Sequence, residues 1–219
     1  MIQPPPFDVI SGLRRTSHGV IALALAAEFD DDVDLAAVEQ ALLDLSSGLR
    51  GIARVRDENQ LALVGDVLGH QLRVAGEHAS TRLDDLLFHR VAVTRRGQAL
   101  VCGLVAIEAA RIAGIPLGIV ATRTAVYLGH CRAASPVVLV PRHDWLPADV
   151  RDLGEPDLAW PCPHESAGML LGMVLARAHR TGMLSTELRA AELCLALPVA
   201  EDERHRLHMQ LARVRARLN

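Results

Sequence analysis

A nearly unbroken apolar run lies between Gly97 and Gly114, and the hydrophobic pattern of the chain is organised around it. After Gln98, only Glu108 and Arg111 interrupt this run. Its large apolar residues point in every direction of a helical wheel: Leu100, Val101, Leu104, Val105, Ile107 and Ile112. A helix that is apolar all round has to be covered on nearly every side. The pattern therefore predicts a buried central helix, which Gly114 ends.

Four shorter helices are predicted before this run, because apolar residues recur there at helical spacing. The predicted ranges are Val20 to Phe29, Leu35 to Gly48 after an N-cap at Asp34, Asp57 to Gly69 with Asp57 as cap, and a helix that follows a capping box of Thr81 and Asp84. The acidic run at 30–34 lacks the spaced ligands, the central glycine and the terminal Glu of a calcium loop. A solvated turn is therefore favoured there.

Past Gly114 the pattern changes to short runs rich in β-branched residues, separated by turn-compatible residues. Residues 117–121, 125–129 and 136–140 predict an antiparallel meander, and residues 141–152 predict a loop with a short helix. A proline-rich crossing leads to three further helices, at about 165–180, 185–196 with Ser185 as cap, and 201–218. Helices, a small sheet and again helices predict an α+β fold with a C-terminal α-helical tail.

Composition narrows the classes of function. The 219 residues are 50% hydrophobic and only 3% aromatic, and the net charge is −3. Stacking on bases needs more aromatic rings than this, and phosphate backbones need a basic stripe, so nucleic acid is not an expected partner. All 23 basic residues are Arg, which excludes a lysine Schiff base.

The cysteines and the first residues predict a location. Four widely spaced cysteines without a CxxC pair indicate reduced thiols. The opening MIQPPPF indicates an extended lead rather than a signal peptide, and the apolar run Val20 to Ala27 is too short to span a bilayer. We therefore expect a soluble, cytoplasmic protein with no membrane partner.

Soft metal ligands occur at His130 and Cys131, at His143, and in the pair Cys162-x-His164. Their spacing matches no standard zinc motif. Scattered surface histidines and buried thiols are therefore favoured over a metal site, and we expect neither a metal nor another cofactor.

Several segments carry a resemblance to a known family through their order and spacing. The segment STRLDDLLFHRVAVTRRGQAL is similar to a family stretch that leads to an RRG motif, and EAARIAGIPLGIV is similar to the motif E-x-A-R-x-x-G-[IL]-P. The helical pair before them (IALALAAEFDDDVDLAAVEQALLDLSSGLR) and the residues Glu165 to Pro198 after them match in order as well. The chain resembles the transglutaminase-like superfamily, specifically its SirB-type branch.

This resemblance implies a papain-like α+β core, in which a central buried helix packs on a small antiparallel sheet. A tetratricopeptide-like helical tail follows the core in the SirB-type branch. The implied parts are an extended lead at residues 1–16, the transglutaminase-like core at 17–160, and the tail at 161–219.

Active members of the superfamily use a Cys-His-Asp arrangement for acyl transfer, with the Cys at the N-terminus of the central helix. Laid on that pattern, the nucleophile position falls at Ala99, the base position at Ala125 and the acid position at Val140. None of these side chains can attack, transfer a proton or orient a base. The resemblance therefore implies no catalytic residue and no transglutaminase or cysteine-protease activity.

Other residues can line the vacated cleft. Cys102 lies one helical turn after Ala99, but a thiol inside an apolar helix gains little from the helix dipole, so a packed core Cys is favoured over a reactive one. His130 falls on the opposite strand face from Ala125 and cannot replace the lost base. The further cleft candidates are Tyr127, for which core packing is the alternative, Arg96 and Gln98.

We interpret the protein as a non-catalytic binding or regulatory module for a protein or a small molecule. The alternative is an enzyme that uses the remodelled cleft for other chemistry on a small molecule, in a specialised biosynthetic pathway. A ligand site needs a pocket with convergent polar groups, whereas a docking module needs an exposed apolar or arginine-rich surface.

The predicted tail holds little more than one tetratricopeptide-like repeat, whereas stable arrays need about three. Its apolar faces need cover, either from a second copy of the chain or from the sheet domain. In the second case four residues dock on that domain: Met169, Leu170, Met173 and Val174. Three arginines are expected on the solvated rim of the last helix: Arg206, Arg213 and Arg217.

Overall fold

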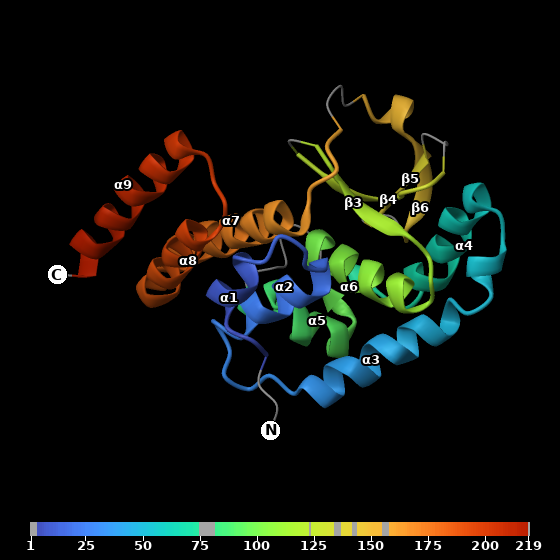
Figure 1. The fold of residues 1–219 in the computed structure, drawn as a ribbon, viewed down its shortest axis with the longest axis horizontal. Helices are drawn as coiled ribbons and strands as arrows, with labels where there is room; N and C mark the ends of the chain where they lie inside the picture. The colour runs from blue at the N-terminus through green and yellow to red at the C-terminus, as the bar shows by residue number, and fades with distance from the viewer. Residues whose placement is uncertain are drawn as a thin grey trace. The chain divides into compact units, whose positions relative to one another are not determined.

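A computed structural model describes residues 4–74, 82–122, 124–133, 137–141, 144–154 and 158–218. The chain divides into two compact units, both drawn in Figure 1: the sheet unit, Asp34–Pro161, and the helix unit, Met1–Val33 together with Cys162–Asn219. Helices together with a four-stranded antiparallel sheet make this an α+β fold, as predicted. Among the described residues, no helix has the length and apolar character that a membrane crossing requires.

The sheet unit contains most of the short elements. In order they are α3 (Leu35–Gly48), η1 (Ile52–Arg54), α4 (Asp57–Gly69), β1 (Arg73–Val74), η2 (Leu83–Leu86), α5 (Phe88–Thr94), β2 (Arg96–Gly97), α6 (Ala99–Ile112), β3 (Leu117–Ala121), β4 (Val126–His130), β5 (Val137–Val140), β6 (Leu146–Asp149) and η3 (Val150–Leu153). β1 and β2 form a short parallel pair, whereas β3 to β6 form the antiparallel sheet in that order.

α6 is the central helix that the apolar pattern predicts. Every residue from Leu100 to Ala110 is buried, since α3 and α5 pack on α6 and so do β3 and β4. Ile112, predicted to be buried, is 39% exposed because it lies in the last turn. Gly114 has φ +82°, the left-handed conformation that ends a helix.

The helix starts of the sheet unit agree with the predictions in part. Asp34 caps α3, and its Oδ1 accepts a hydrogen bond from Ala37 N at 3.1 Å. α4 has Arg56 at its N-cap position, so the predicted cap, Asp57, is instead the first helical residue. Asp84 lies in η2, ahead of α5, and its predicted capping partner at position 81 falls outside the described residues.

The predicted meander is confirmed: β3 pairs with β4, and β4 with β5, both antiparallel. β6 is a further strand, in residues predicted as a loop with a short helix, and η3 is that short helix. Pro147 is tolerated in β6 because β6 is the last strand of the sheet, where its outer side needs no ladder hydrogen bond.

Strand alternation gives the sheet two faces. Ile119 and Leu128 point toward α6, because a Cβ built at Gly103 would lie 3.2 Å and 3.4 Å from their side chains. The alternate residues of each strand point to the opposite face, called the far face. Buried residues form a second apolar cluster there: Val120, Tyr127 and Val138.

The helix unit joins two N-terminal helices with three C-terminal ones. They are α1 (Phe7–Ser11), α2 (His18–Ala26), α7 (Pro163–Thr181), α8 (Leu184–Ala196) and α9 (Glu201–Leu218). α1 corrects the predicted extended lead over residues 1–16: Phe7 and Ile10 are buried, so the residues after the prolines gain a packed helix. The three C-terminal helices are confirmed, but α8 has Met183 rather than Ser185 at its N-cap.

The chain's own first helices help to cover α7 and α8. α2 packs on α7, and α1 packs on α8. An ion pair of Glu28 with Arg189 joins the end of α2 to α8. This cover differs from both predicted sources, which were the sheet domain and a second copy. The two units divide between Pro161 and Cys162, one residue from the predicted boundary, but α2, predicted within the core at 17–160, lies in one unit with α7 and α8.

Candidate functional site

The three positions that the resemblance assigns to catalysis are not brought together. Ala99 is the first residue of α6. Ala125 and Val140 instead pack against the apolar cluster on the far face, whereas α6 covers the other face of the sheet. The sheet therefore separates the implied base and acid positions from the implied nucleophile position.

His130 lies at the other end of α6. His130 pairs with Leu117, which follows the last residue of α6 by five positions. Ala99 is at the opposite end of this 14-residue helix, about 20 Å from its last residue. Nδ1 of His130 accepts a hydrogen bond from Ala133 N at 2.9 Å, and Nε2 lies 3.1 Å from Gln60 Oε1. Burial lowers the pKa of His130. It is therefore a neutral, buried structural group and not the predicted surface histidine.

Cys102 is a core residue. Its side chain is fully buried, and the thiol lies 3.8 Å from the backbone oxygen of Arg73. Burial raises the pKa of Cys102 to about 12. Because the thiolate is the nucleophile, this thiol is inactive near neutral pH.

The four predicted cleft residues lie in different places. Cys102 is inside the core, and Tyr127 is buried on the far face. Gln98 occupies the N-cap position of α6, and its side chain makes no capping hydrogen bond. Arg96 lines a cavity, which we call the Arg96 pocket.

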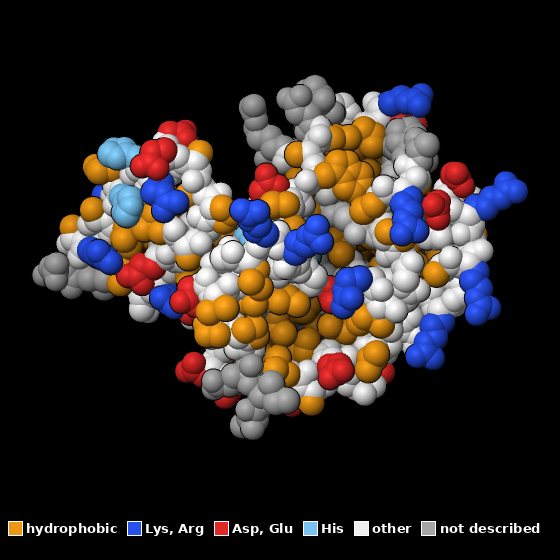
Figure 2. Space-filling view, viewed as in Figure 1, with side chains coloured by type: hydrophobic (Ala, Val, Ile, Leu, Met, Phe, Trp, Pro, Cys, Tyr) orange, Lys and Arg blue, Asp and Glu red, His pale blue; other side chains and the backbone are white. Residues whose placement is uncertain are grey.

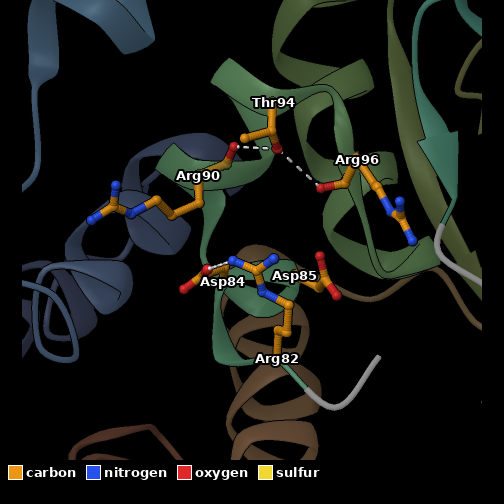
Figure 3. A pocket seen from close by; sticks show the side chains of 6 residues that line it. All are labelled: Arg82, Asp84, Asp85, Arg90, Thr94 and Arg96. Carbon is orange, nitrogen blue, oxygen red and sulfur yellow. Dashed lines mark hydrogen bonds and ion pairs between the residues drawn. The ribbon is translucent and has the colours of Figure 1, made fainter. Parts of the chain in front are cut away.

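The Arg96 pocket has a volume of about 430 Å³ and lies at three neighbouring elements of the sheet unit (Figure 3). Its lining residues are Arg82, Asp84, Asp85, Arg90, Thr94 and Arg96. η2 and the residue before it supply the first three, α5 supplies the next two, and β2 supplies the last. Three arginines and two aspartates leave one net positive charge at the cavity.

A glycine allows β2 to approach η2. A Cβ built at Gly97 would lie 2.9 Å from the backbone oxygen of Asp85 and would collide with the side chain of Val91. That oxygen accepts a hydrogen bond from Gln98 N at 2.9 Å. A backbone hydrogen bond therefore connects η2, which forms one wall of the pocket, to Gln98 at the N-cap of α6.

A left-handed turn places Thr94 and Arg96 at the same cavity. Arg95, between them, has φ +57°, a conformation that costs a non-glycine residue roughly 1 to 2 kcal/mol. The backbone oxygen of Arg95 accepts a hydrogen bond from Arg73 N at 2.8 Å, and β1 pairs with β2. These bonds hold the strained turn that shapes the pocket.

The charges of the Arg96 pocket are only partly paired. Arg82 Nη2 donates to Asp84 Oδ2 at 2.7 Å. Within the part of the chain that the structure describes, neither the Asp85 carboxylate nor the Arg96 guanidinium makes a hydrogen bond or an ion pair. In Figure 3 both side chains extend toward the same side of the view, Arg96 from β2 and Asp85 from η2. The pocket therefore offers one group of each sign to a ligand.

A second cavity, called the α7–α9 groove, lies in the helix unit. It has a volume of about 1000 Å³ and is lined by residues of α7, α8 and α9. α7 contributes small residues at intervals of four positions: Gly168, Gly172 and Ala176. A Cβ built at Gly172 would meet no atom within 4 Å, so this side of α7 is open.

The buried charge of the α7–α9 groove is paired. The Glu187 side chain is only 4% exposed; its Oε1 lies 2.9 Å from His179 Nδ1, and its Oε2 accepts a hydrogen bond from Arg217 Nη1 at 3.0 Å. Arg206 and Arg213 are exposed, as predicted for the rim of α9. Arg217 is exposed as well, and it also forms an ion pair with the buried carboxylate of Glu187 on α8.

The predicted soft metal ligands differ in how far they are buried. Cys131 and Cys162 are exposed rather than buried, and the predicted ligand at position 143 lies outside the described residues. Among the residues that are described, no group of three or more His, Cys, Asp or Glu side chains is placed to hold a metal ion.

The charged surface is mixed. On the face drawn in Figure 2, arginines and acidic side chains are interspersed among the described residues, without a continuous basic stripe. This face offers no surface of the kind that phosphate backbones need.

Comparison with known proteins adds no relative: no protein-family model, no curated protein and no solved structure matches the chain. The resemblance to the transglutaminase-like superfamily therefore rests on its motifs alone.

Of the residues that line the Arg96 pocket, only Arg96 is among the candidates predicted from the sequence. The missed residues are Arg82, Asp84, Asp85, Arg90 and Thr94. One signal points to them: two aspartates and several arginines crowd into residues 82–96, directly before the buried helix. Charge at that density next to an apolar run indicates a polar surface at the start of the helix, although not a cavity.

Proposed function

We propose that this protein is a non-catalytic binding module whose small-molecule ligand lies in the Arg96 pocket. The observation that carries the proposal is one cavity with both a carboxylate, Asp85, and a guanidinium, Arg96, that have no partner among the described residues. Convergent polar groups at a cavity distinguish a ligand site from an apolar docking surface.

The state of the candidate reactive groups supports binding over catalysis. Cys102 is buried and protonated. His130 is neutral and uses both ring nitrogens in internal contacts. The alternative, an enzyme with a remodelled cleft, would need one of these groups at the pocket, and neither lines it.

We propose, as the resemblance implies, that the sheet unit is a transglutaminase-like core of the SirB-type branch. A buried helix packed on an antiparallel sheet is the arrangement that such a core requires. The far-face positions of Ala125 and Val140 argue against the residue-by-residue placement of the triad. The proposal therefore rests on architecture and motif order. A cytoplasmic location belongs to it, because the four cysteines are free thiols.

Thermal melting with a library of small carboxylates, amines, phosphates and amino acids tests the proposed binding. At least one compound is expected to raise the melting temperature of the wild-type chain, because a ligand at 100 times its Kd stabilises the folded state by about 2.7 kcal/mol. The same compound should not stabilise Arg96→Gln. Arg50→Gln, which changes an exposed arginine of the sheet unit outside the pocket, is the matched control.

Two results contradict the proposed function. One is a library in which no compound stabilises the wild-type chain. The other is a set of compounds that stabilise Arg96→Gln as strongly as the wild type, since their binding site then lies elsewhere.

Thiol labelling tests the absence of a reactive cysteine. Cys131 and Cys162 should react with a thiol reagent in the folded protein, because both are exposed. Cys102 and Cys194 should react only after unfolding, because burial raises their pKa to about 12 and about 11. Rapid stoichiometric labelling of Cys102 in the folded state would reinstate the enzyme alternative.

A further inference from the structure

We infer that the ligand of the Arg96 pocket is a zwitterion, a small molecule of amino-acid type whose carboxylate binds Arg96 and whose ammonium group binds Asp85. The inference rests on the proposed function, because it assumes that this pocket is the binding site. It adds the chemical class of the ligand.

Some of the charged groups at the Arg96 pocket have partners within the described part of the chain, and others do not. Arg82 is paired with Asp84 at 2.7 Å, and Arg90 extends away from Arg96 in Figure 3. The remaining charged groups are the Arg96 guanidinium and the Asp85 carboxylate, which form no ion pair with each other. One free group of each sign at one cavity fits a ligand that carries both signs.

The positive side of the site is the guanidinium of Arg96. A guanidinium is a planar fork of N–H donors that matches a carboxylate with two parallel hydrogen bonds. Arg96 is exposed and belongs to β2, where its pairing with Arg73 fixes the backbone. The backbone of Arg96 is therefore fixed, and its guanidinium is free to donate hydrogen bonds to a carboxylate.

The negative side of the site is the carboxylate of Asp85. An ionised carboxylate such as Asp85 only accepts hydrogen bonds. The hydroxyl of Thr94 also can only accept from a ligand, because it donates its proton to the backbone oxygen of Arg90 at 2.7 Å, with a longer contact of 3.3 Å to that of Arg96. An ammonium group brings three donors and no acceptor. It therefore suits both Asp85 and Thr94.

The volume of the Arg96 pocket limits the size of its ligand. The cavity of about 430 Å³ lies at the small end of the roughly 300 to 1,000 Å³ that ligand pockets span. That volume suits a molecule of the size of one amino acid or a small derivative of it. Gly97 and the left-handed Arg95 hold the walls in place before any ligand arrives.

Isothermal titration calorimetry with three matched ligand classes tests the inference. The probes are the standard α-amino acids, their N-acetyl derivatives, which lack the ammonium group, and their carboxamides, which lack the carboxylate. At least one free amino acid should bind, and each capped form of it should bind at least about tenfold more weakly, since each loses a charge-assisted contact. This comparison of ligand classes uses only the wild-type chain, so its result does not depend on whether any variant folds.

Variants then assign the two contacts. Arg96→Gln and Asp85→Asn should each weaken binding of the free amino acid at least about tenfold. Arg50→Gln and Asp66→Asn, which change exposed charges outside the pocket, should leave it unchanged. Asp85→Asn should weaken binding of the free amino acid more than binding of its N-acetyl form, because the N-acetyl form has no ammonium group to lose.

Two outcomes overturn the inference. If an N-acetyl derivative binds as tightly as the free amino acid and Asp85→Asn has no effect, the ligand is a simple anion; the zwitterion is then wrong while the proposed binding function stands. If none of the three classes binds, the zwitterion is wrong as well, and the Arg96-dependent stabilisation measured with the wider library decides the proposed function separately.

Discussion

The α7–α9 groove and the Arg96 pocket contain the same kinds of charged side chain but differ in how those charges are used. In the α7–α9 groove, the buried carboxylate of Glu187 forms an ion pair with Arg217 from α9 and lies within hydrogen-bond distance of His179 from α7. In the Arg96 pocket, Asp85 and Arg96 have no such partner within the described residues. The difference indicates that the first set of charges holds three helices together, whereas the second set is available to a ligand.

The largest expected effect is on the groove. Glu187→Ala should lower the free energy of unfolding by about 2 to 3 kcal/mol, because it removes charge-assisted hydrogen bonds to both neighbouring helices. The loss stays below the roughly 3 to 5 kcal/mol of a fully buried pair, because His179 and Arg217 are 67% and 43% exposed and can rehydrate. Urea denaturation of the variant and the wild type measures the difference.

Glu192→Ala is the matched control for Glu187→Ala. Glu192 also lies on α8 and forms ion pairs with Arg189 and Arg215, but its side chain is 34% exposed. Its removal should cost no more than about 1 kcal/mol. Equal losses for the two glutamates would show that burial of Glu187 carries no special weight, and the contrast between the cavities would fail.

The next largest effect is expected at the pocket wall. Gly97→Ala should destabilise the chain by about 1 to 2 kcal/mol and weaken ligand binding, because the added Cβ pushes against the backbone oxygen of Asp85. Gly172→Ala is the control, since a Cβ there meets open space. Unchanged stability of Gly97→Ala would mean that β2 and η2 do not need their close approach.

The sequence predicts those parts of the fold that depend on periodicity within one segment. α6 is recognised because its apolar residues surround the helix, and β3 to β5 because short β-rich runs follow one another with turns between them. α1 is not recognised, because the prolines before it indicate an extended chain and only the burial of Phe7 and Ile10 stabilises a helix after them. β6 is hidden by Pro147, which only an edge strand accommodates.

The candidate site depends on distant contacts and is predicted far less completely. Arg96 can be singled out from the RRG motif, but its meeting with Asp85 requires the close approach at Gly97 and the pairing of β1 with β2. The partnership of Glu187 with Arg217 spans 30 residues and two helices. The local sequence predicts neither that Asp85 and Arg96 lack partners among the described residues nor that Glu187 is paired. Both depend on which side chains the fold brings together.

His130 is a buried polar group of the sheet unit, and it sharpens the comparison through pH. Burial lowers the pKa of His130 in the folded protein; Arg132 adds to this effect and Asp57 opposes it. As pH falls below about 6.5, the unfolded chain takes up the proton first, so the free energy of unfolding decreases, by at most about 1.4 kcal/mol per pH unit, until the pKa of the folded state is reached. Above that window the group contributes no pH dependence.

Urea denaturation at several pH values between 7.5 and 5 measures this effect against His130→Gln, which cannot titrate. The wild type should lose more stability on acidification than the variant, so that the difference between them shrinks as pH falls. Parallel stability curves would mean that His130 keeps its ordinary pKa and is not a structural group like Glu187.

The smallest effect is expected for the charges of the Arg96 pocket. Arg96→Gln and Asp85→Asn should each change the free energy of unfolding by less than about 0.5 kcal/mol, because neither side chain has a partner to lose within the described residues. Both substitutions keep the backbone oxygen of Asp85 that binds Gln98 N, so the wall itself is preserved. Measured beside Glu187→Ala, these variants separate charge that stabilises from charge that binds. A loss as large as that of Glu187→Ala would place Asp85 and Arg96 among the structural charges and remove the basis for a ligand between them.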